Sequence, residues 1–246
     1  MRQRVTIGQA MPRRATAGRI REASSRLELV KMANDNNYFA SARMDLFSMV
    51  EGDRNRVLEL GCGLGKTGAL LKNRGKAVEV VGIELDPEIA RSAEANIDRV
   101  ICGDIERLEL AFEEDSFDYV VAGDILEHLI DPWAVLRRLR RFVKTGGAVI
   151  VSIPNIRNWR IIADLTLRGD WRYCDEGLLD RTHLRFFTRS TIIDLMERTG
   201  YEIEFICPAF RFAPTSKSAI ANRLSGGMFE SFITRQYLVR ARRSAI

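Results

Sequence analysis

The sequence predicts a doubly wound α/β fold, in which helices cover both faces of a largely parallel sheet. Three observations along residues 56–153 predict this fold. Short apolar runs alternate with stretches of helical composition, a Gly-rich loop follows the first run, and acidic residues stand at or just after the ends of successive runs. Alternation of this kind is typical of consecutive βαβ units.

Each expected element has its own local signal. Apolar runs predict strands, whereas Asp-Pro pairs and glycines mark helix starts and ends. The expected strands are 56–60, 78–84, 100–102, 117–122, 148–153, 201–207 and 236–241, with a glycine turn at 145–147. Residues 22–50 are expected to be helical, with an interruption at 34–37. Further helices are expected at 66–74, capped by Gly75, from Asp86-Pro87 to about Asn96, from Asp131-Pro132 onward, and at 190–198.

The domain organisation follows from where this rhythm stops. Residues 1–21 carry six arginines and no acid, and we expect a solvated basic arm. Residues 22–246 form one expected domain with two insertions. The first, 155–187, lacks clean periodicity and is rich in aromatic and charged residues, and the second, 208–234, is expected to be a loop with a short helix.

Bulk composition narrows the classes of partner. The net charge of +5 comes from the arm, because the remaining chain is close to neutral, so the charge says little about the substrate. A basic arm can bind nucleic acid or an acidic membrane surface, but we expect a small-molecule acceptor and not nucleic acid. No apolar run reaches the roughly 18–20 residues of a membrane span. The four cysteines are dispersed, which fits a reducing cytoplasm and predicts neither a zinc site nor disulfides. The oligomeric state is not predicted.

Three kinds of Gly-rich loop compete for residues 61–68. A dinucleotide loop needs glycine at position 66, where Lys66 stands. Gly65-Lys66-Thr67 matches the end of a P-loop, but the first glycine of that motif falls on Leu60. The third pattern, an acid followed by three glycines at alternate positions, is matched in full by 59–65.

This third pattern resembles class I S-adenosylmethionine-dependent methyltransferases. The stretch around Asp124-Ile-Leu-Glu127-His128 resembles the group with ubiquinone-biosynthesis and methionine-biosynthesis-like members, and the insertion is similar to glycan-associated methyltransferases. The resemblance implies a Rossmann-like seven-stranded sheet with its last strand antiparallel, and S-adenosyl-L-methionine as cofactor. It also places 155–187 on the substrate side.

The resemblance assigns cofactor contacts to the ends of four strands. Glu59 is expected to meet the cationic methionine part, Glu84 to accept the ribose hydroxyls, and Asp104 to meet the adenine amino group. Asp86 follows the same strand, but Glu84 is the better candidate for the ribose, and Asp86 is expected alternatively to cap the helix that begins at Pro87. The full expected set is Glu59, Gly61, Cys62, Gly63, Gly65, Glu84, Leu85, Gly103, Asp104, Ile105, Gly123 and Asp124. Arg43 is expected to pair with the carboxylate of the cofactor or with an exposed acid.

The chemistry expected is methyl transfer to oxygen in a small polar acceptor, such as a sugar or glycan intermediate. The catalytic candidates are the two histidines, His128 and His183, with Asp180 orienting His183 as general base. In some quinone O-methyltransferases an acid-x-x-Glu-His pattern holds a metal, but we expect none here. Three alternatives remain: a non-catalytic cofactor-binding partner protein, a P-loop-like nucleotide enzyme, or methylation of nucleic acid or protein, for which the basic arm is the sole argument.

Overall fold

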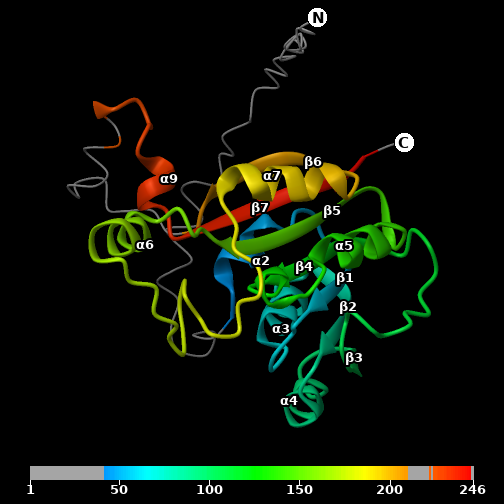
Figure 1. Cartoon of the computed structure of the whole chain (residues 1–246). Coiled ribbons are helices and arrows are strands. Elements are labelled where there is room, and N and C mark those ends of the chain that lie inside the picture. Colours follow the sequence, from blue (N-terminus) through cyan, green and yellow to red (C-terminus); the bar gives the residue numbers. More distant parts are fainter. Residues whose placement is uncertain (1–41, 210–221, 223, 245–246) are drawn as a thin grey trace, which may run out of the picture.

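The computed structural model describes residues 42–209, 222 and 224–244, which form a layered α/β domain (Figure 1). Its strands make one sheet of seven in the order β3-β2-β1-β4-β5-β7-β6. Their bounds are β1 (Asn55–Leu60), β2 (Ala77–Glu84), β3 (Arg99–Cys102), β4 (Phe117–Gly123), β5 (Val143–Pro154), β6 (Tyr201–Pro208) and β7 (Gln236–Arg243). β7 lies between β5 and β6 and is antiparallel to both, whereas β1 to β5 pair in parallel. The predicted Rossmann-like sheet with a reversed last strand is confirmed.

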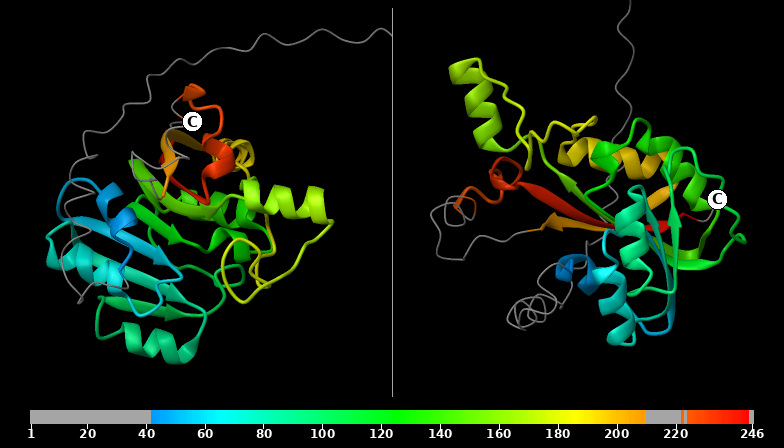
Figure 2. Two further views of the ribbon diagram at one scale, coloured as in Figure 1. Left: turned by 90° about the vertical axis from the view of Figure 1, so that its left-hand side faces the viewer. Right: turned by 90° about the horizontal axis from the view of Figure 1, so that it is seen from below.

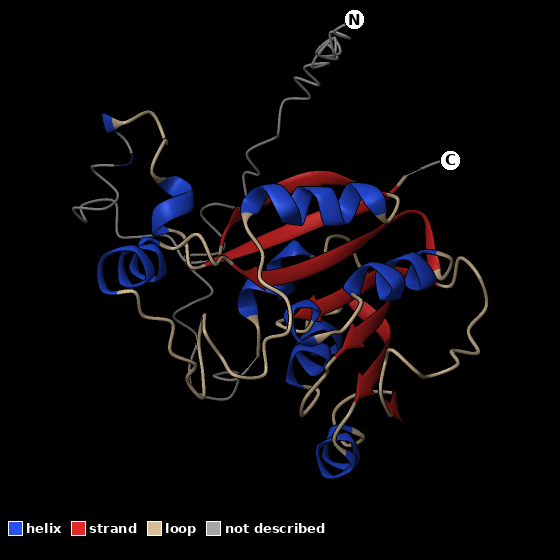
Figure 3. Cartoon of the chain, viewed as in Figure 1, coloured by secondary structure: helices blue, strands red, loops and turns tan. Residues whose placement is uncertain are grey.

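Helices cover both faces of this sheet, as predicted (Figure 3). α5 and α7 pack with residues such as Leu58 and Val120 in one core cluster, and α2 and α3 pack with Val57 and Val121 in the other. Neighbouring strand residues point to opposite faces, so one short apolar run supplies both clusters. The helical elements are α2 (Met44–Met49), α3 (Lys66–Asn73), α4 (Pro87–Ala93), η2 (Leu126–His128), α5 (Pro132–Arg140), α6 (Trp159–Ala163), η3 (Asp164–Arg168), α7 (Arg189–Arg198) and α9 (Glu230–Ile233).

Two element boundaries differ from the prediction by more than two residues. α4 ends at Ala93 instead of near Asn96, and the Asn96 side chain donates to the Leu64 carbonyl at 2.8 Å, which ties the chain after the helix to the glycine loop. β5 begins at Val143, before the predicted turn, because Val143 already pairs with Phe117. The glycines at 146 and 147 therefore form an irregularity inside β5, not a turn ahead of it.

The insertion 155–187 contains helical structure that its sequence did not predict. α6 continues directly into the π-helical segment η3, and Gly169 closes it in a left-handed conformation with φ +64°. Figure 2 shows this helix projecting beyond the sheet. Residues 22–41 of the predicted N-terminal helices, the arm 1–21 and residues 210–221 lie outside the described residues, so the domain boundaries stay predictions.

Within 42–209, 222 and 224–244, no helix combines the length and the apolar composition that a membrane crossing requires.

Candidate active site

The sheet brings the predicted cofactor residues of four strands to one edge. Leu60 pairs with Ile83 on one side and with Ala122 on the other, and Glu84 pairs with Cys102. The carboxyl ends of β1, β2, β3 and β4 are therefore neighbours. Ligands of open α/β sheets bind at this edge.

A cavity of about 210 Å³ opens where the glycine loop leaves β1. Its wall is formed by residues from α2 and its N-cap, from the end of β1, from the glycine loop, from the start of α3 and from the end of β4, namely Arg43, Leu46, Glu59, Gly61, Cys62, Gly63, Leu64, Lys66, Thr67 and Gly123. Five of the expected cofactor residues thus line one cavity together. Gly65 caps α3 behind this wall and packs against Ile97.

Gly63 has the geometry of a position that accommodates a ligand. Its φ of +54° is in the left-handed region that favours glycine, and a Cβ placed there would meet no atom within 4 Å. Gly61 differs, because a Cβ there would lie 2.1 Å from Cδ1 of Ile125. Packing within the protein thus demands glycine at 61, whereas the space beside Gly63 is open.

Glu59 is a buried carboxyl in the cavity wall. Its side chain is 6% exposed, and Oε2 has no hydrogen-bond partner among the residues the structure describes. Burial raises the pKa of Glu59 to about 8, against the opposing contacts with the Gly68 N–H and the Thr67 side chain. A cation brought into the cavity would supply the missing partner.

Cys62 contributes its backbone to the loop, whereas its side chain belongs to the core. Its Sγ would lie 2.5 Å from a Cβ on Gly82, so the thiol packs against β2. Burial is the main cause that raises the pKa of the thiol to about 12, and the charges of Glu59 and Glu84 also raise it. The thiol is therefore protonated and fills space beneath the loop.

Glu84 joins the end of β2 to the glycine loop. Its Oε2 accepts from the Gly63 N–H at 2.9 Å, and its Oε1 accepts from the N–H groups of Leu85 and Asp86 at 2.8 and 3.1 Å. The Asp86 side chain instead caps α4 by accepting from the N–H groups of Glu88 and Ile89, which is the cap role predicted for it as the alternative. The Leu85 side chain is 67% exposed beside this carboxylate.

The third strand end is held by local contacts. Oδ1 of Asp104 accepts from the Glu106 N–H at 2.9 Å, and Arg107 lies 3.4 Å from its other oxygen. Gly103 has a φ of +150° and lies against Leu108. Ile105 is buried in the core cluster under α5, so the residue predicted to cover an adenine ring is mainly a core residue.

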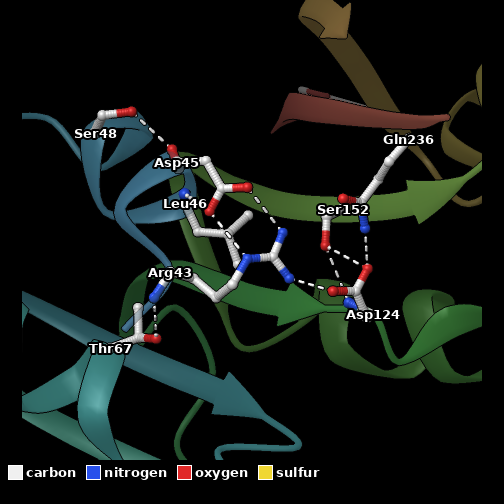
Figure 4. Close-up of polar contacts among 8 residues, drawn as sticks. All are labelled: Arg43, Asp45, Leu46, Ser48, Thr67, Asp124, Ser152 and Gln236. Carbon is white, nitrogen blue, oxygen red and sulfur yellow. Dashed lines mark hydrogen bonds and ion pairs between the residues drawn. The ribbon is translucent and has the colours of Figure 1, made fainter. Parts of the chain in front are cut away.

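Asp124, expected at the cofactor, is engaged by the protein itself. Figure 4 shows its carboxylate between Arg43 and Gln236, with Ser152 donating to Oδ1 at 3.0 Å. The Arg43 guanidinium also pairs with Asp45 at 2.8 Å. The pairing of Arg43 with acids, one of its two predicted roles, is therefore present, and it links α2 to the end of β4.

The two histidines predicted to be catalytic meet just beyond β4. Their ring centroids are 4.8 Å apart, although 55 positions separate them in the chain. Nδ1 of His183 faces the Leu178 carbonyl at 3.3 Å, and Nδ1 of His128 faces the Thr182 carbonyl at 3.2 Å. Because a carbonyl only accepts, Nδ1 of each ring donates in these contacts, and Nε2 is the ring nitrogen left for another partner.

Asp180 does not orient His183 as predicted. Its Oδ1 accepts from the Thr182 N–H at 2.8 Å and from the Thr182 hydroxyl at 2.6 Å. That hydroxyl in turn lies 3.0 Å from Nδ1 of His128. Asp180 therefore acts on His128 through Thr182, and the Leu178 carbonyl takes the orienting position at His183.

Glu127 completes this cluster. It is 1% exposed, its Oε2 has no hydrogen-bond partner in the described chain, and burial raises its pKa to about 8. Glu127, His128 and His183 each offer a metal-ligand atom, and these atoms lie within 4.8 Å of one another. Asp124, the first acid of the metal pattern, is instead held by Arg43 and Gln236.

Several site residues were not singled out from the sequence. Thr67 and Gly68 begin α3 against Glu59, and Ser152 and Gln236 hold Asp124. A serine within the apolar strand run 148–153 was the available signal for Ser152, because a buried hydroxyl needs a partner. Gln236 gave no such signal, since its contact joins positions 112 apart in the chain.

Comparisons with known proteins agree with this geometry. Residues 32–204 match the family model described as a methyltransferase domain. The chain is 34% identical to a ubiquinone biosynthesis O-methyltransferase of Xanthomonas oryzae pv. oryzae over 176 residues, which are 66% of this chain and 70% of that protein. It is 31% identical over 105 residues to a malonyl-[acyl-carrier protein] O-methyltransferase of Paenibacillus, covering 39% of this chain but only 38% of that protein.

Solved structures share the fold. An S-adenosylmethionine-dependent methyltransferase from Mesorhizobium loti aligns with a TM-score of 0.57 at 20% identity, over 83% of this chain and 100% of that one. A second, from Archaeoglobus fulgidus, aligns with a TM-score of 0.57 at 19% identity, over 83% and 96%. At these identities the likeness concerns the fold alone.

Proposed function

The chain belongs to the family of methyltransferase domains, whose cofactor is S-adenosyl-L-methionine, and we propose that it transfers the methyl group to a hydroxyl oxygen of a small acceptor. The pair of histidines that follows β4, the strand whose last residue Gly123 lines the glycine-loop cavity, carries the proposal for oxygen. A hydroxyl must lose its proton as it attacks, and an Nε2 atom with a lone pair can accept that proton.

The cavity fits the cofactor that the family uses. The open space at Gly63 admits a ligand against the backbone, and the unpartnered oxygen of Glu59 suits the cationic methionine part. Arg43 lies in the same wall, within reach of a carboxylate. When bound, S-adenosyl-L-methionine supplies an electrophilic methyl group on a sulfonium. Alignment of that group with the acceptor oxygen contributes much of the catalysis, since the sulfide leaves without assistance.

His183 is the proposed general base. Burial lowers the pKa of His183 below the usual 6.5. The contact with the Leu178 carbonyl opposes this shift, and the charge of His128 adds to it. The ring is therefore neutral at pH 7 and ready to accept a proton. The Leu178 carbonyl holds Nδ1 and leaves Nε2 for the acceptor. His128, oriented by Thr182 and Asp180, lies in edge contact with it, with the ring centroids 4.8 Å apart.

The acceptor class follows from matching a weak base to its proton. A phenol, with a pKa of about 10, is far closer to a histidine than an aliphatic sugar hydroxyl is. The insertion offers aromatic faces, with Trp171 and Phe186 in edge contact 5.5 Å apart. Together with relatives named for ubiquinone biosynthesis, this favours a phenolic hydroxyl over the sugar that the sequence suggested.

Transfer of a labelled methyl group to a panel of phenols and sugars tests the proposal. We expect label on phenolic oxygen and a loss of about 10²-fold or more in kcat for His183→Asn, with a changed pH profile and little change in cofactor affinity. Label on a sugar would overturn the acceptor class. Cofactor binding with no transfer to any acceptor would support the non-catalytic partner protein instead.

A further inference from the structure

The helix formed by α6 and η3 has an apolar composition but no buried residue. It runs from Trp159 to Arg168, and neither part contains a buried side chain. Its apolar residues are among the most exposed in the described chain, with Trp159 at 51%, Leu165 at 45% and Leu167 at 83%. A short helix is marginal in water, and most helices gain their stability by burying one face.

A second exposed apolar segment lies beside this helix. Leu224, Met228 and Phe229 are exposed just before α9, with Leu224 at 84% and Met228 at 70%. The two segments are joined at their bases, because Asn158 donates to the Thr234 carbonyl at 3.3 Å and the Arg157 guanidinium lies 4.3 Å from the centre of the Phe232 ring. In Figure 1, α6 and α9 lie next to each other at the same end of the sheet.

Exposed apolar side chains are concentrated in these segments. Of the 15 large hydrophobic side chains that are exposed in the described residues, 10 belong to 159–186 and 224–229. They are Trp159, Ile162, Leu165, Leu167, Tyr173, Leu184, Phe186, Leu224, Met228 and Phe229. Scattered exposed hydrophobics are ordinary, but a concentration of this kind marks an interaction surface. We call these ten residues, together with Arg157 and Arg160, the apolar flank.

Arginines carry positive charge into the apolar flank. Arg157 and Arg160 form no ion pair with any acid in the described part of the chain, and Arg160 lies 5.7 Å from the centre of the Trp159 ring. The nearby acids Asp164 and Asp170 are already paired, with Arg168 and Arg172 at 2.8 and 2.9 Å. Tryptophan beside an arginine that has no ion pair is typical of surfaces that lie in the head-group region of a bilayer.

The apolar flank adjoins the candidate active site. α6 follows the carboxyl end of β5, and α9 precedes β7, whose first residue Gln236 pairs with Pro154. Gln236 also donates to Asp124, the residue that follows the cavity-lining Gly123. A surface covering the flank would therefore lie at the ligand edge of the sheet.

We propose that the apolar flank docks the protein onto the surface of a bilayer that contains anionic lipid. The apolar side chains enter the head-group region, and Arg157 and Arg160 meet the lipid phosphates. No span is involved, and the proposal is independent of the acceptor and of catalysis.

Vesicle binding by the full-length chain tests the proposal. We expect co-sedimentation with vesicles of phosphatidylglycerol and phosphatidylcholine, weaker binding to phosphatidylcholine alone, and a blue shift of tryptophan emission that Trp159→Phe reduces. Replacing both Arg157 and Arg160 with Gln should weaken binding about 25-fold, or about fivefold for each charge. Leu165→Ser with Leu167→Ser should weaken it about tenfold or more.

Matched variants elsewhere provide the controls. Ile89→Ser removes an exposed apolar residue from α4, and Arg137→Gln removes an exposed arginine from α5. Both should bind vesicles as the unmodified chain does. Circular dichroism and the thermal shift with S-adenosylhomocysteine identify any variant that has lost its fold.

Two outcomes would overturn the proposal. If replacing the six arginines of 1–21 with Gln abolishes vesicle binding while the flank variants have no effect, the basic arm is the lipid-binding element. If sedimentation shows a dimer that Leu165→Ser with Leu167→Ser converts to a monomer, and vesicles are not bound, the flank is an interface between two copies of the chain.

Discussion

Replacing Glu59 with Gln should remove the pH dependence of cofactor binding. The carboxyl is buried in the cavity wall, and its pKa of about 8 means that it is mainly protonated at pH 7 in the ligand-free protein. A cationic ligand favours the ionised form, so binding requires the release of a proton. Glutamine has the same shape as the protonated acid but has no proton to lose.

The magnitude follows from the fraction of Glu59 that is ionised. With a pKa of about 8, this fraction is about one tenth at pH 7 and about one hundredth at pH 6, and the apparent dissociation constant rises by the inverse factor. We therefore expect S-adenosylmethionine to bind about tenfold more tightly at pH 7 than at pH 6, and about fivefold more tightly again at pH 8, where about half of Glu59 is ionised. Glu59→Gln should bind weakly and with little variation over the same range.

Titration calorimetry at pH 6, 7 and 8, in two buffers of different ionisation enthalpy, measures both quantities. The ratio of the affinities of the two proteins removes the titration of the ligand's own amino group. Glu127→Gln is the matched control, because Glu127 is equally buried and its pKa is also raised to about 8, but it does not line the cavity. If the ratio between wild type and Glu59→Gln stays constant with pH, or no proton is released, Glu59 does not meet the cation.

The same shift affects the stability of the ligand-free protein, and the sign can be worked out. The pKa of Glu59 in the folded state lies above the unfolded value of 4.5. The contribution of Glu59 to the free energy of unfolding is therefore complete below pH 4.5 and is lost as the pH rises through 8. At 1.36 kcal/mol per pH unit, the ceiling is about 5 kcal/mol. Glu59→Gln should therefore gain stability relative to wild type between pH 4.5 and 8 in urea unfolding.

Three further predictions concern the same edge of the sheet. Gly63→Val should keep its fold but lose the thermal shift with S-adenosylhomocysteine. Gly75→Val is the control, because Gly75 has a similar φ of +71° and equally open space but lies outside the cavity. Both variants should lose a comparable stability of about 1–2 kcal/mol, and only Gly75→Val should keep the thermal shift. Glu84→Ala should weaken cofactor binding about tenfold or more, whereas Asp86→Ala should lower the melting temperature by loss of the α4 cap and leave affinity unchanged. Methyl transfer should survive EDTA, because Asp124, the first acid of the metal pattern, is already bound by Arg43 and Gln236; activity restored only by added metal would contradict this.

The sequence could predict the sheet and the cavity because both depend on local signals. A strand end followed by glycines and an acid, as at Glu59 and Gly63, fixes which edge of a parallel sheet binds the ligand. Alternation of apolar runs fixes the order of layers. Even the cap role of Asp86 followed from its position before Pro87.

What the sequence could not predict depends on contacts between distant positions. The burial of Glu59 and the resulting pKa depend on how α3 packs across the loop. Asp124 was assigned to the cofactor because it follows β4, but Arg43, 81 positions away, already binds it. The helix at 159–168 has no buried face, so its sequence lacks the periodicity by which helices are predicted.

The charged groups of the site are balanced against one another within the protein, which bears on how a zwitterionic ligand binds. Arg43 is paired with Asp45 and Asp124, Glu59 holds a proton, and Glu84 accepts from three backbone N–H groups. A ligand carboxylate at Arg43 would replace one carboxylate with another, at small electrostatic cost. The ligand cation cannot replace another cation in this way, because Glu59, the buried acid of the cavity wall, must first lose its proton. Recognition of the cation at Glu59 is therefore the step that should set the pH dependence of binding.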